Sequence, residues 1–172
     1  MRRILVIGTL HENLTPENEL FELLKKYQPT QILVEITQKD LQKEKITKYP
    51  PEMRAIYRWA KKHHLIIKGF DSPINILRPG ITKAREAQSV KKFKELIAGL
   101  TWKDLNQKAY DEIGDEDLKE LIDPEKDQKR EQEMLSNIQN LIAPEGIIVI
   151  VTGAGHLNFF EKNLADAEFP LR

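Results

Sequence analysis

The chain has 172 residues, of which 40% are hydrophobic and 31% are charged, a composition typical of a folded globular protein and not of a disordered one. Lysine and arginine together number 27, as do aspartate and glutamate, so a formal net charge of zero gives no general attraction to nucleic acid or to an anionic membrane. There are no cysteines, which excludes disulfides, thiolate metal ligands and a cysteine nucleophile. The apolar stretch at the amino terminus is too short for a signal-peptide core, and no run reaches membrane-spanning length, so we expect a cytoplasmic protein without a membrane partner.

Short apolar runs predict β-strands that are buried on both faces. They are Ile4–Ile7, Ile32–Val34 and Ile147–Val151, with Leu65–Lys68 as a fourth candidate. These runs are rich in β-branched residues and do not alternate with polar residues, as is typical of parallel strands covered by helices. Helical patterns lie between them, so the sequence predicts an α/β fold with a mostly parallel sheet, flanking helices and right-handed crossovers.

Two helices are predicted between the first strands. In the first, Thr15 is the expected N-cap and Pro16 the first helical residue. The second ends at His63 and His64 after two lysines. Because cations are favourable at a helix C-terminus, we expect these two histidines to be structural.

The middle of the chain, residues 81–143, is highly charged and shows no strand pattern. It predicts a helical insertion or cap between the N-terminal βαβαβ part and the last strand, within one domain over residues 1–172. Such an insertion offers a surface for a homodimer, which the sequence leaves open. The expected helices are Thr82–Gly99, Trp102–Asp111, Asp115–Ile122 and Pro124–Leu141.

Polar side chains follow each predicted strand. His11 and Glu12 come after the first strand, Glu35 after the second, Asp71 after the Leu65–Lys68 candidate and His156 after the last. In open parallel sheets, ligands bind outside the carboxyl ends of the strands. We therefore expect these side chains to line one cleft.

The two histidines share a local pattern, since Gly8 and Gly153 each precede a histidine by three residues at the end of a buried run. Glycine permits a sharp turn and a close backbone approach, so two neighbouring turns would bring both imidazoles into one cleft. Neutral imidazoles with carboxylates are a common ligand set for a divalent metal such as zinc, manganese or cobalt. The alternative, that each histidine only hydrogen-bonds a nearby backbone carbonyl, stays open.

Glu35 directly follows an apolar run, where an unpaired carboxylate is costly to bury. We expect it to be paired, metal-bound or exposed at the strand end. The Gly153–Gly155 pair lacks the third glycine of a dinucleotide-binding fingerprint, because position 158 is Asn158, so no nucleotide cofactor is expected.

The order of these elements resembles a known family. It is similar to the TraB/PrgY/Tiki superfamily, which also takes in erythromycin-esterase-like and ChaN-like proteins. Members tend to carry an arginine on the helix before the last Gly-x-x-His strand, in the pattern Arg-x-x-x-Met-x-x-x-Ile. The matching positions here, which run across nearly the whole chain, are Gly8, His11, Glu35, Arg130, Met134, Ile138, Gly153 and His156.

The resemblance implies one cleft lined by the paired motifs. Tiki proteins look like metal-dependent proteases and erythromycin esterases are hydrolases, whereas ChaN is associated with haem binding. On this resemblance, His11, His156 and Glu12 would hold a divalent metal. Glu35 would be the general base that activates a water, and Arg130 would stabilise an oxyanion or bind a substrate carboxylate or phosphate.

The expected function is therefore a metal-assisted hydrolase that cleaves an ester or a peptide or amide bond in a small-molecule or peptide substrate. Two alternatives stay open. One is a non-catalytic module of the same fold that binds a small ligand. The other is a structural protein whose histidines only satisfy hydrogen bonds in the core.

Overall fold

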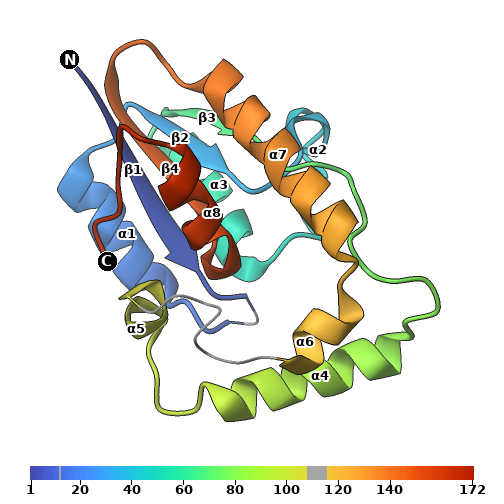
Figure 1. Ribbon diagram of the computed structural model, residues 1–172. Helices are drawn as coiled ribbons and strands as arrows, with labels where there is room; N and C mark the ends of the chain where they lie inside the picture. Colours follow the sequence, from blue (N-terminus) through green and yellow to red (C-terminus); the bar gives the residue numbers. More distant parts are fainter. Residues whose placement is uncertain (12, 108–115) are drawn as a thin grey trace.

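The computed structural model describes residues 1–11, 13–107 and 116–172, and its centre is a parallel sheet of five strands in the order β3-β2-β4-β1-β5 (Figure 1). The neighbouring strands all pair in parallel. This arrangement confirms the predicted α/β fold. The strands are β1 (Arg2–Thr9), β2 (Gln31–Val34), β3 (Ile66–Gly69), β4 (Gly146–Gly153) and β5 (Ala167–Glu168).

Helices cover both faces of this sheet. The chain moves one way along the sheet from β1 to β3 and the other way from β3 to β5. With right-handed crossovers, the helices of the two directions lie on opposite faces. Accordingly α1 contacts α3, and α7 contacts α8 on the other face (Figure 1). The helices are α1 (Glu17–Tyr27), α2 (Gln38–Gln42), α3 (Pro51–Lys62), α4 (Lys83–Leu96), α5 (Trp102–Gln107), α6 (Glu116–Leu121), α7 (Pro124–Leu141) and α8 (Leu157–Asn163).

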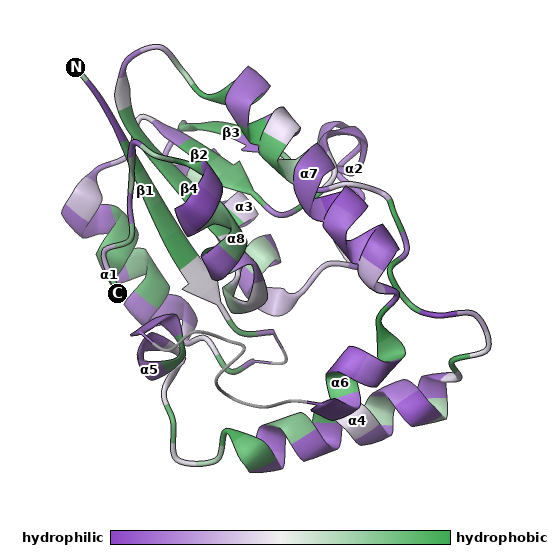
Figure 2. Ribbon diagram, viewed as in Figure 1, coloured by the Kyte–Doolittle hydropathy of each residue, from purple (hydrophilic) through white to green (hydrophobic). Residues whose placement is uncertain are grey.

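The two central strands, β1 and β4, carry the two Gly-x-x-His motifs. They pair in a register that sets Thr9 opposite Gly153. Both strands are buried over their last six residues, and in Figure 2 the body of β1 is hydrophobic whereas much of α7 is hydrophilic. After β1 the chain leaves toward one face and after β4 toward the other, which is the kind of position where open sheets bind ligands.

Thr15 does not cap the first helix, which corrects the prediction for that position. Helix α1 begins at Glu17, and Pro16 holds the N-cap position without a side-chain hydrogen bond. The Thr15 hydroxyl instead accepts from the backbone N–H of Leu10 (2.7 Å) and donates to the carbonyl of Leu10 (3.0 Å). It therefore fixes the backbone immediately before His11.

A short strand, β5, follows α8, so β4 is not the last strand. It pairs with β1 at only two positions, Ile4 with Ala167 and Leu5 with Glu168. Two residues are too few to produce a periodic pattern in the sequence. The short helix α2 was missed for a similar reason. It begins after Thr37, whose hydroxyl accepts from the backbone N–H of Asp40.

The predicted insertion consists of two parts that differ in how they pack. Helix α7, with the predicted bounds, lies on the sheet and buries Met134 and Ile138 completely. It is thus the crossover helix between β3 and β4. Helices α4 and α6 instead contact each other beyond the sheet, joined by the ion pair between Arg85 and Asp117 at 2.7 Å (Figure 1).

Two other predicted helices of the insertion end earlier than expected, α4 at Leu96 and α6 at Leu121. Helix α5 reaches Gln107, and residues 108–111 of its predicted span lie outside the described residues. Over the described part of the chain, none of the helices is both long and apolar enough to cross a membrane.

Candidate functional site

Side chains from five elements meet at the carboxyl edge of the sheet. His11 follows β1, Glu35 follows β2, Asp71 follows β3 and His156 follows β4, while Arg130 comes from α7. We call these five residues the strand-end cluster. Arg130 contacts three of its members directly, and the remaining one, His11, lies across Gly153 from Glu35.

Glu35 is a buried carboxylate with three hydrogen-bond donors. Arg130 Nη2 (2.8 Å), the Thr152 hydroxyl (2.8 Å) and the backbone N–H of Gly153 (2.6 Å) all donate to it. Burial alone would raise the pKa of Glu35, but the positive charges of His156 and Arg130 outweigh it and hold this pKa well below its usual range. Glu35 is therefore ionised at neutral pH and fully paired.

Arg130 joins the ends of β2 and β3. Its Nε and Nη2 both donate to Asp71 Oδ1, at 3.1 Å and 2.7 Å, and Nη2 also reaches Glu35. The backbone N–H of Ser72 donates to the same Asp71 oxygen (2.8 Å). The guanidinium is aimed this way because Met134 and Ile138, one and two turns along the same helix face, pack into the core.

His156 is enclosed by charged groups. Its Nδ1 lies 2.8 Å from Glu131 Oε1, and its Nε2 lies 3.6 Å from Glu35 Oε1 and 3.2 Å from Arg130 Nη1. Burial lowers the pKa of His156, but the carboxylates of Glu35 and Glu131 outweigh it and raise this pKa to about 10. At neutral pH His156 is therefore an imidazolium, and both of its nitrogens carry protons.

His11 has a different environment. Its Nδ1 lies 2.6 Å from Oε1 of Glu52, a carboxylate in the first turn of α3 whose side chain is only 1% exposed. Among the described residues, Oε2 of Glu52 has no hydrogen-bond partner. The His11 side chain itself is 45% exposed. Burial lowers the pKa of His11, but the hydrogen bond to Glu52 and the charge of Glu35 outweigh it, so the pKa lies above its ordinary value.

The free nitrogen of His11 faces the second motif. Nε2 lies 3.4 Å from the point where a Cβ on Gly153 would sit, and Glu35 Oε2 lies 3.6 Å from the same point. A side chain at Gly153 would therefore occupy the space between the imidazole and the carboxylate. Nδ1 is tied to a buried acid, and within residues 1–11, 13–107 and 116–172 no hydrogen-bond partner lies at Nε2, which is the arrangement of an oriented general base.

Of the two roles expected of the motif glycines, the structure shows the close approach at Gly8 and no special turn conformation at Gly153. Gly153 has a φ of −61°, which any residue adopts. A Cβ on Gly8 would lie 2.6 Å from Leu157 Cδ1 and 2.9 Å from Asn106 Oδ1. The buried Asn106 amide of α5 also accepts from the backbone N–H of Gly8 (2.9 Å) and donates to its carbonyl (2.8 Å), so it fixes the end of β1.

The side chains that the structure describes fit a metal centre shared by both histidines poorly. An imidazolium has no free nitrogen lone pair, and the Arg130 cation already lies 3.2 Å from His156 Nε2. The described residues contain no group of three or more His, Asp or Glu side chains arranged to hold a metal. The third predicted ligand, Glu12, lies outside the described residues. The divalent ion therefore stays a prediction of the sequence.

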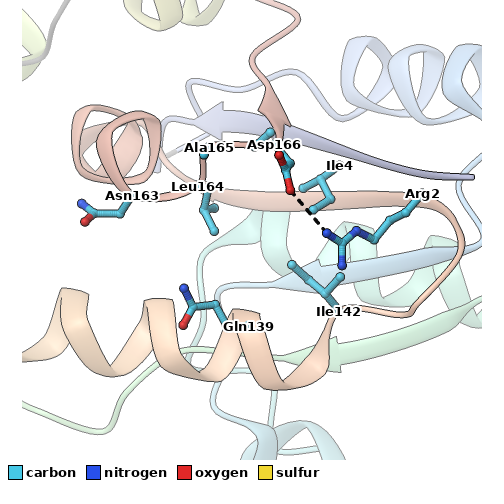
Figure 3. Close-up of a pocket in the computed structure, with 9 residues that line it drawn as sticks. Arg2, Ile4, Gln139, Ile142, Asn163, Leu164, Ala165 and Asp166 are labelled. Carbon is cyan, nitrogen blue, oxygen red and sulfur yellow. Dashed lines mark ion pairs between the residues drawn. The ribbon is translucent and has the colours of Figure 1, made fainter.

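Two cavities lie beside the sheet, at opposite ends of its strands. The larger, of about 830 Å³, has Arg130 and Asp71 in its wall and adjoins the strand-end cluster. We call it the β3 cavity. The smaller, of about 210 Å³, lies near the start of β1 and is bordered by the ion pair between Arg2 and Asp166 (Figure 3). Because it is at the amino ends of the strands, the carboxyl-end rule favours the β3 cavity as the ligand site.

The remaining histidines, His63 and His64, follow the last residue of α3, as the sequence predicts. His63 Nδ1 lies 2.8 Å from the carbonyl of Trp59, and the two rings stack with centroids 4.1 Å apart. His64 has a φ of 55° just after α3. Both lie at the end of the helix, away from the strand-end cluster.

Sequence reasoning missed three residues that hold the cluster in place. Glu52 and Glu131 are acids on amphipathic helices, where a carboxylate usually faces solvent, and Asn106 lies in the charged middle of the chain. The only available signal was that Glu131 is the next residue after Arg130, which the sequence places on the inward face of its helix. Their partners are 25 to 98 residues away in the sequence, so no local pattern reveals the pairing.

Comparison with known proteins adds no relative. No family model matches the chain, and neither a curated protein nor a solved structure matches it. The fold and the strand-end cluster thus define the class only as an α/β protein with a polar site at the carboxyl edge of a parallel sheet. The likeness to the TraB/PrgY/Tiki superfamily stays a prediction that depends on the short motifs.

Proposed function

We propose that the protein is a hydrolase of an ester or an amide bond, including a peptide bond, and that His11 is its general base. One observation carries the proposal. The His11 Nδ1 is held at 2.6 Å by the buried Glu52 carboxylate, while Nε2, next to Gly153 and Glu35, has no hydrogen-bond partner in the described part of the chain. Histidine oriented by a buried acid is a recurring way to activate a nucleophile.

His11 suits the role of base better than Glu35 does. A general base works best when its pKa lies near the operating pH. The pKa of Glu35 is held well below its usual range, because burial is outweighed by His156 and Arg130. Burial also opposes protonation of His11, but Glu52 and Glu35 raise its pKa above the ordinary value for histidine. The sequence-based assignment of Glu35 as the base is therefore replaced in our proposal by a role in holding Arg130.

In this mechanism, water bound near His11 Nε2 gives a proton to the imidazole and its oxygen attacks the substrate carbonyl. The carbonyl oxygen becomes negative and is stabilised by Arg130. Nε and Nη2 of that guanidinium are already bound by Asp71 and Glu35. Nη1 lies 3.2 Å from His156 Nε2, which cannot accept a hydrogen bond when it is protonated, so Nη1 is the atom that would donate to the oxyanion. His11 then returns the proton to the leaving alcohol or amine as the tetrahedral intermediate collapses.

The metal-assisted form of this reaction is a separate hypothesis with its own test. Metal-bound histidines commonly present the second ring nitrogen to a carboxylate, as His11 does to Glu52. Titration of wild-type protein and of His11→Ala with manganese, cobalt and zinc, followed by melting temperature, tests it by mass action. A metal that stabilises only the wild type supports the metal-assisted form. Equal curves for both proteins leave His11 as a base without a metal ligand role.

Hydrolysis is tested with a panel of 4-nitrophenyl esters and peptide 4-nitroanilides. We expect His11→Ala to lower kcat/KM by roughly 10²–10⁴-fold, the usual contribution of general acid–base catalysis. His63→Ala removes an exposed structural histidine and is the matched control, with unchanged rates. We expect the rate to rise with pH as His11 loses its proton. Glu52→Gln should shift this rise to lower pH, and both results together would support the pairing of His11 with Glu52. Turnover that His11→Ala leaves unchanged would refute the proposal, and binding without any turnover would favour the ligand-binding alternative.

A further inference from the structure

The β3 cavity borders the strand-end cluster on the side of Arg130 and Asp71. Its volume of about 830 Å³ lies in the usual range of roughly 300–1,000 Å³ for small-molecule sites. Two members of the strand-end cluster, Arg130 and Asp71, form its inner end. A ligand that fills the cavity is therefore in reach of the one guanidinium that the mechanism uses.

The two walls of the cavity differ in chemistry. One wall is α2 with the loop after it, and it presents lysines and polar side chains. The other is the extended segment that follows β3, where Pro73, Ile74 and Ile76 are apolar. The cavity therefore suits a ligand that is charged on one side and apolar on the other.

The lysine wall carries more positive than negative charge. Lys39, Lys45 and Lys48 line it together with a single acid, Asp40. That acid is already occupied, since Lys48 lies 2.7 Å from it and the Tyr49 hydroxyl donates to it at 2.8 Å. Across residues 1–11, 13–107 and 116–172, no carboxylate forms an ion pair with Lys39 or Lys45.

At the inner end of the cavity, the acid is likewise already paired with neighbouring groups. Its acid, Asp71, accepts two hydrogen bonds from Arg130 and one from the backbone N–H of Ser72. Both acids of the cavity are thus neutralised by neighbours, whereas two of its lysines are not. The free charge that a ligand meets is positive.

The lysine wall is also held in place before any ligand binds. Gln38 Oε1 accepts from the backbone N–H of Gly69 (2.7 Å), which ties α2 to the end of β3. The Tyr49 hydroxyl accepts from the backbone N–H of Thr37 (3.1 Å) and joins the end of the loop to the start of α2. A preformed wall lowers the entropy cost of binding.

We infer that the β3 cavity is the substrate pocket and that the substrate is anionic, with a carboxylate or a phosphate bound by Lys39 and Lys45. The apolar part of the substrate lies against Ile74 and Ile76, and its reacting carbonyl faces Arg130. This assignment of the substrate class depends on the proposed hydrolase function for the reaction, but the binding of an anion in the cavity does not.

Binding is measured first, by isothermal titration with glutarate, with inorganic phosphate and with the neutral glutaramide. We expect the wild type to bind one of the anions and not the amide. The double variant Lys39→Gln/Lys45→Gln should weaken the binding of that anion by about tenfold or more, equivalent to about 1.4 kcal/mol. The control is Lys43→Gln/Lys62→Gln, which removes the same charge from two exposed lysines outside the cavity and should bind as the wild type does. The preferred anion, glutarate or phosphate, identifies the group that the substrate carries.

Hydrolysis is measured next, with the mono-4-nitrophenyl ester of glutaric acid and the neutral 4-nitrophenyl pentanoate. We expect the lysine-wall variant to raise KM for the anionic ester only, with kcat nearly unchanged, because the base at His11 is untouched. His11→Ala should keep anion binding and lose turnover.

The two proposals can fail separately. Anion binding that depends on Lys39 and Lys45 without turnover of any ester would keep the pocket and refute the hydrolase. The opposite result is turnover that depends on His11 but is the same for anionic and neutral esters and for the wild type and the lysine-wall variant. That result would support the hydrolase and overturn the anionic pocket. The pocket is also overturned if neither anion binds, or if the lysine-wall and control variants weaken binding equally.

Discussion

His11 and His156 occupy equivalent positions in two copies of one motif, yet the fold gives them opposite environments. Each histidine lies three residues after a glycine at the end of a central strand, and the strands are paired neighbours. The His11 side chain is 45% exposed and touches one carboxylate, whereas that of His156 is 13% exposed and lies between two carboxylates and Arg130. Sequence equivalence therefore does not imply chemical equivalence.

The difference arises from the helices that face each strand end. His11, after β1, contacts Glu52 at the N-terminus of α3. After β4 the chain meets α7, which offers both Glu131 and Arg130. A histidine with one acid partner keeps a free nitrogen for chemistry, while a histidine with two becomes a fixed cation. We call His11 and Glu52 the first half of the site, and His156, Glu131, Arg130, Glu35 and Asp71 the second half. In our proposal the first half reacts and the second half holds the charges in place.

The largest effect should come from the charge that holds the second half together. We expect Arg130→Met to lower the free energy of unfolding by about 3–5 kcal/mol, because it leaves Glu35 and Asp71 buried without their cation. Urea denaturation measures this change. Arg58→Ala, which removes an exposed pair with Glu17 at 3.7 Å, is the control and should cost about 0–1 kcal/mol. A similar small loss in both variants would contradict the view that Arg130 organises the site.

The second prediction concerns pH and the charge of His156. Its pKa is raised from the ordinary 6.5 to about 10 in the folded state, because the carboxylates of Glu35 and Glu131 outweigh burial. The resulting stability is fully present below about pH 6.5 and is lost as the pH rises toward 10. We expect unfolding free energy to fall across this window by up to about 1.4 kcal/mol per pH unit.

His156→Gln should flatten this pH dependence, which denaturation at pH 6, 8 and 10 measures. His64→Gln removes an exposed histidine and should leave the slope unchanged. If the wild-type stability is constant between pH 7 and 10, His156 is not the buried cation that we describe.

The third prediction is that substitutions of the two motif glycines have different effects on stability and on turnover. Gly8→Ala places a methyl group 2.6 Å from Leu157 Cδ1, and we expect a loss of about 1–3 kcal/mol from overpacking. Gly153→Ala meets His11 Nε2 at 3.4 Å, so it should change stability less but crowd the reactive space and lower turnover. Gly155→Ala has nothing within 4 Å and is the control for both. Thermal unfolding and ester hydrolysis, measured on all three, would show whether the halves of the site separate in this way.

The smallest effect concerns the link between His11 and Glu52. A double-mutant cycle with His11→Ala and Glu52→Gln should give a coupling free energy of roughly 1 kcal/mol, as expected for two side chains in contact. The cycle of His11→Ala with Glu131→Gln joins residues of different halves and should give a coupling near zero. A larger coupling in the second cycle would show that the two halves act as one unit.

Much of the fold followed from short-range patterns. The apolar runs at Ile4–Ile7, Ile32–Val34 and Ile147–Val151 all lie within parallel strands, because burial on both faces demands continuous apolar residues. Helix α7 has the predicted bounds, since Asp123 caps it and Pro124 begins it. The short elements α2 and β5 gave no such signal because they are too brief for a period to show.

The candidate site was predictable in its membership but not in its chemistry. The sequence placed His11, Glu35, Asp71 and His156 at strand ends, because the carboxyl ends of parallel strands share one edge. Only the tertiary structure assigned their partners, because Glu52, Glu131 and Arg130 reach them from helices whose rotation depends on packing against the whole sheet. Protonation followed from those partners, since burial and neighbouring charges set a pKa. Local pattern thus decided which residues gather, and long-range packing decided which histidine is a cation and which keeps a free nitrogen.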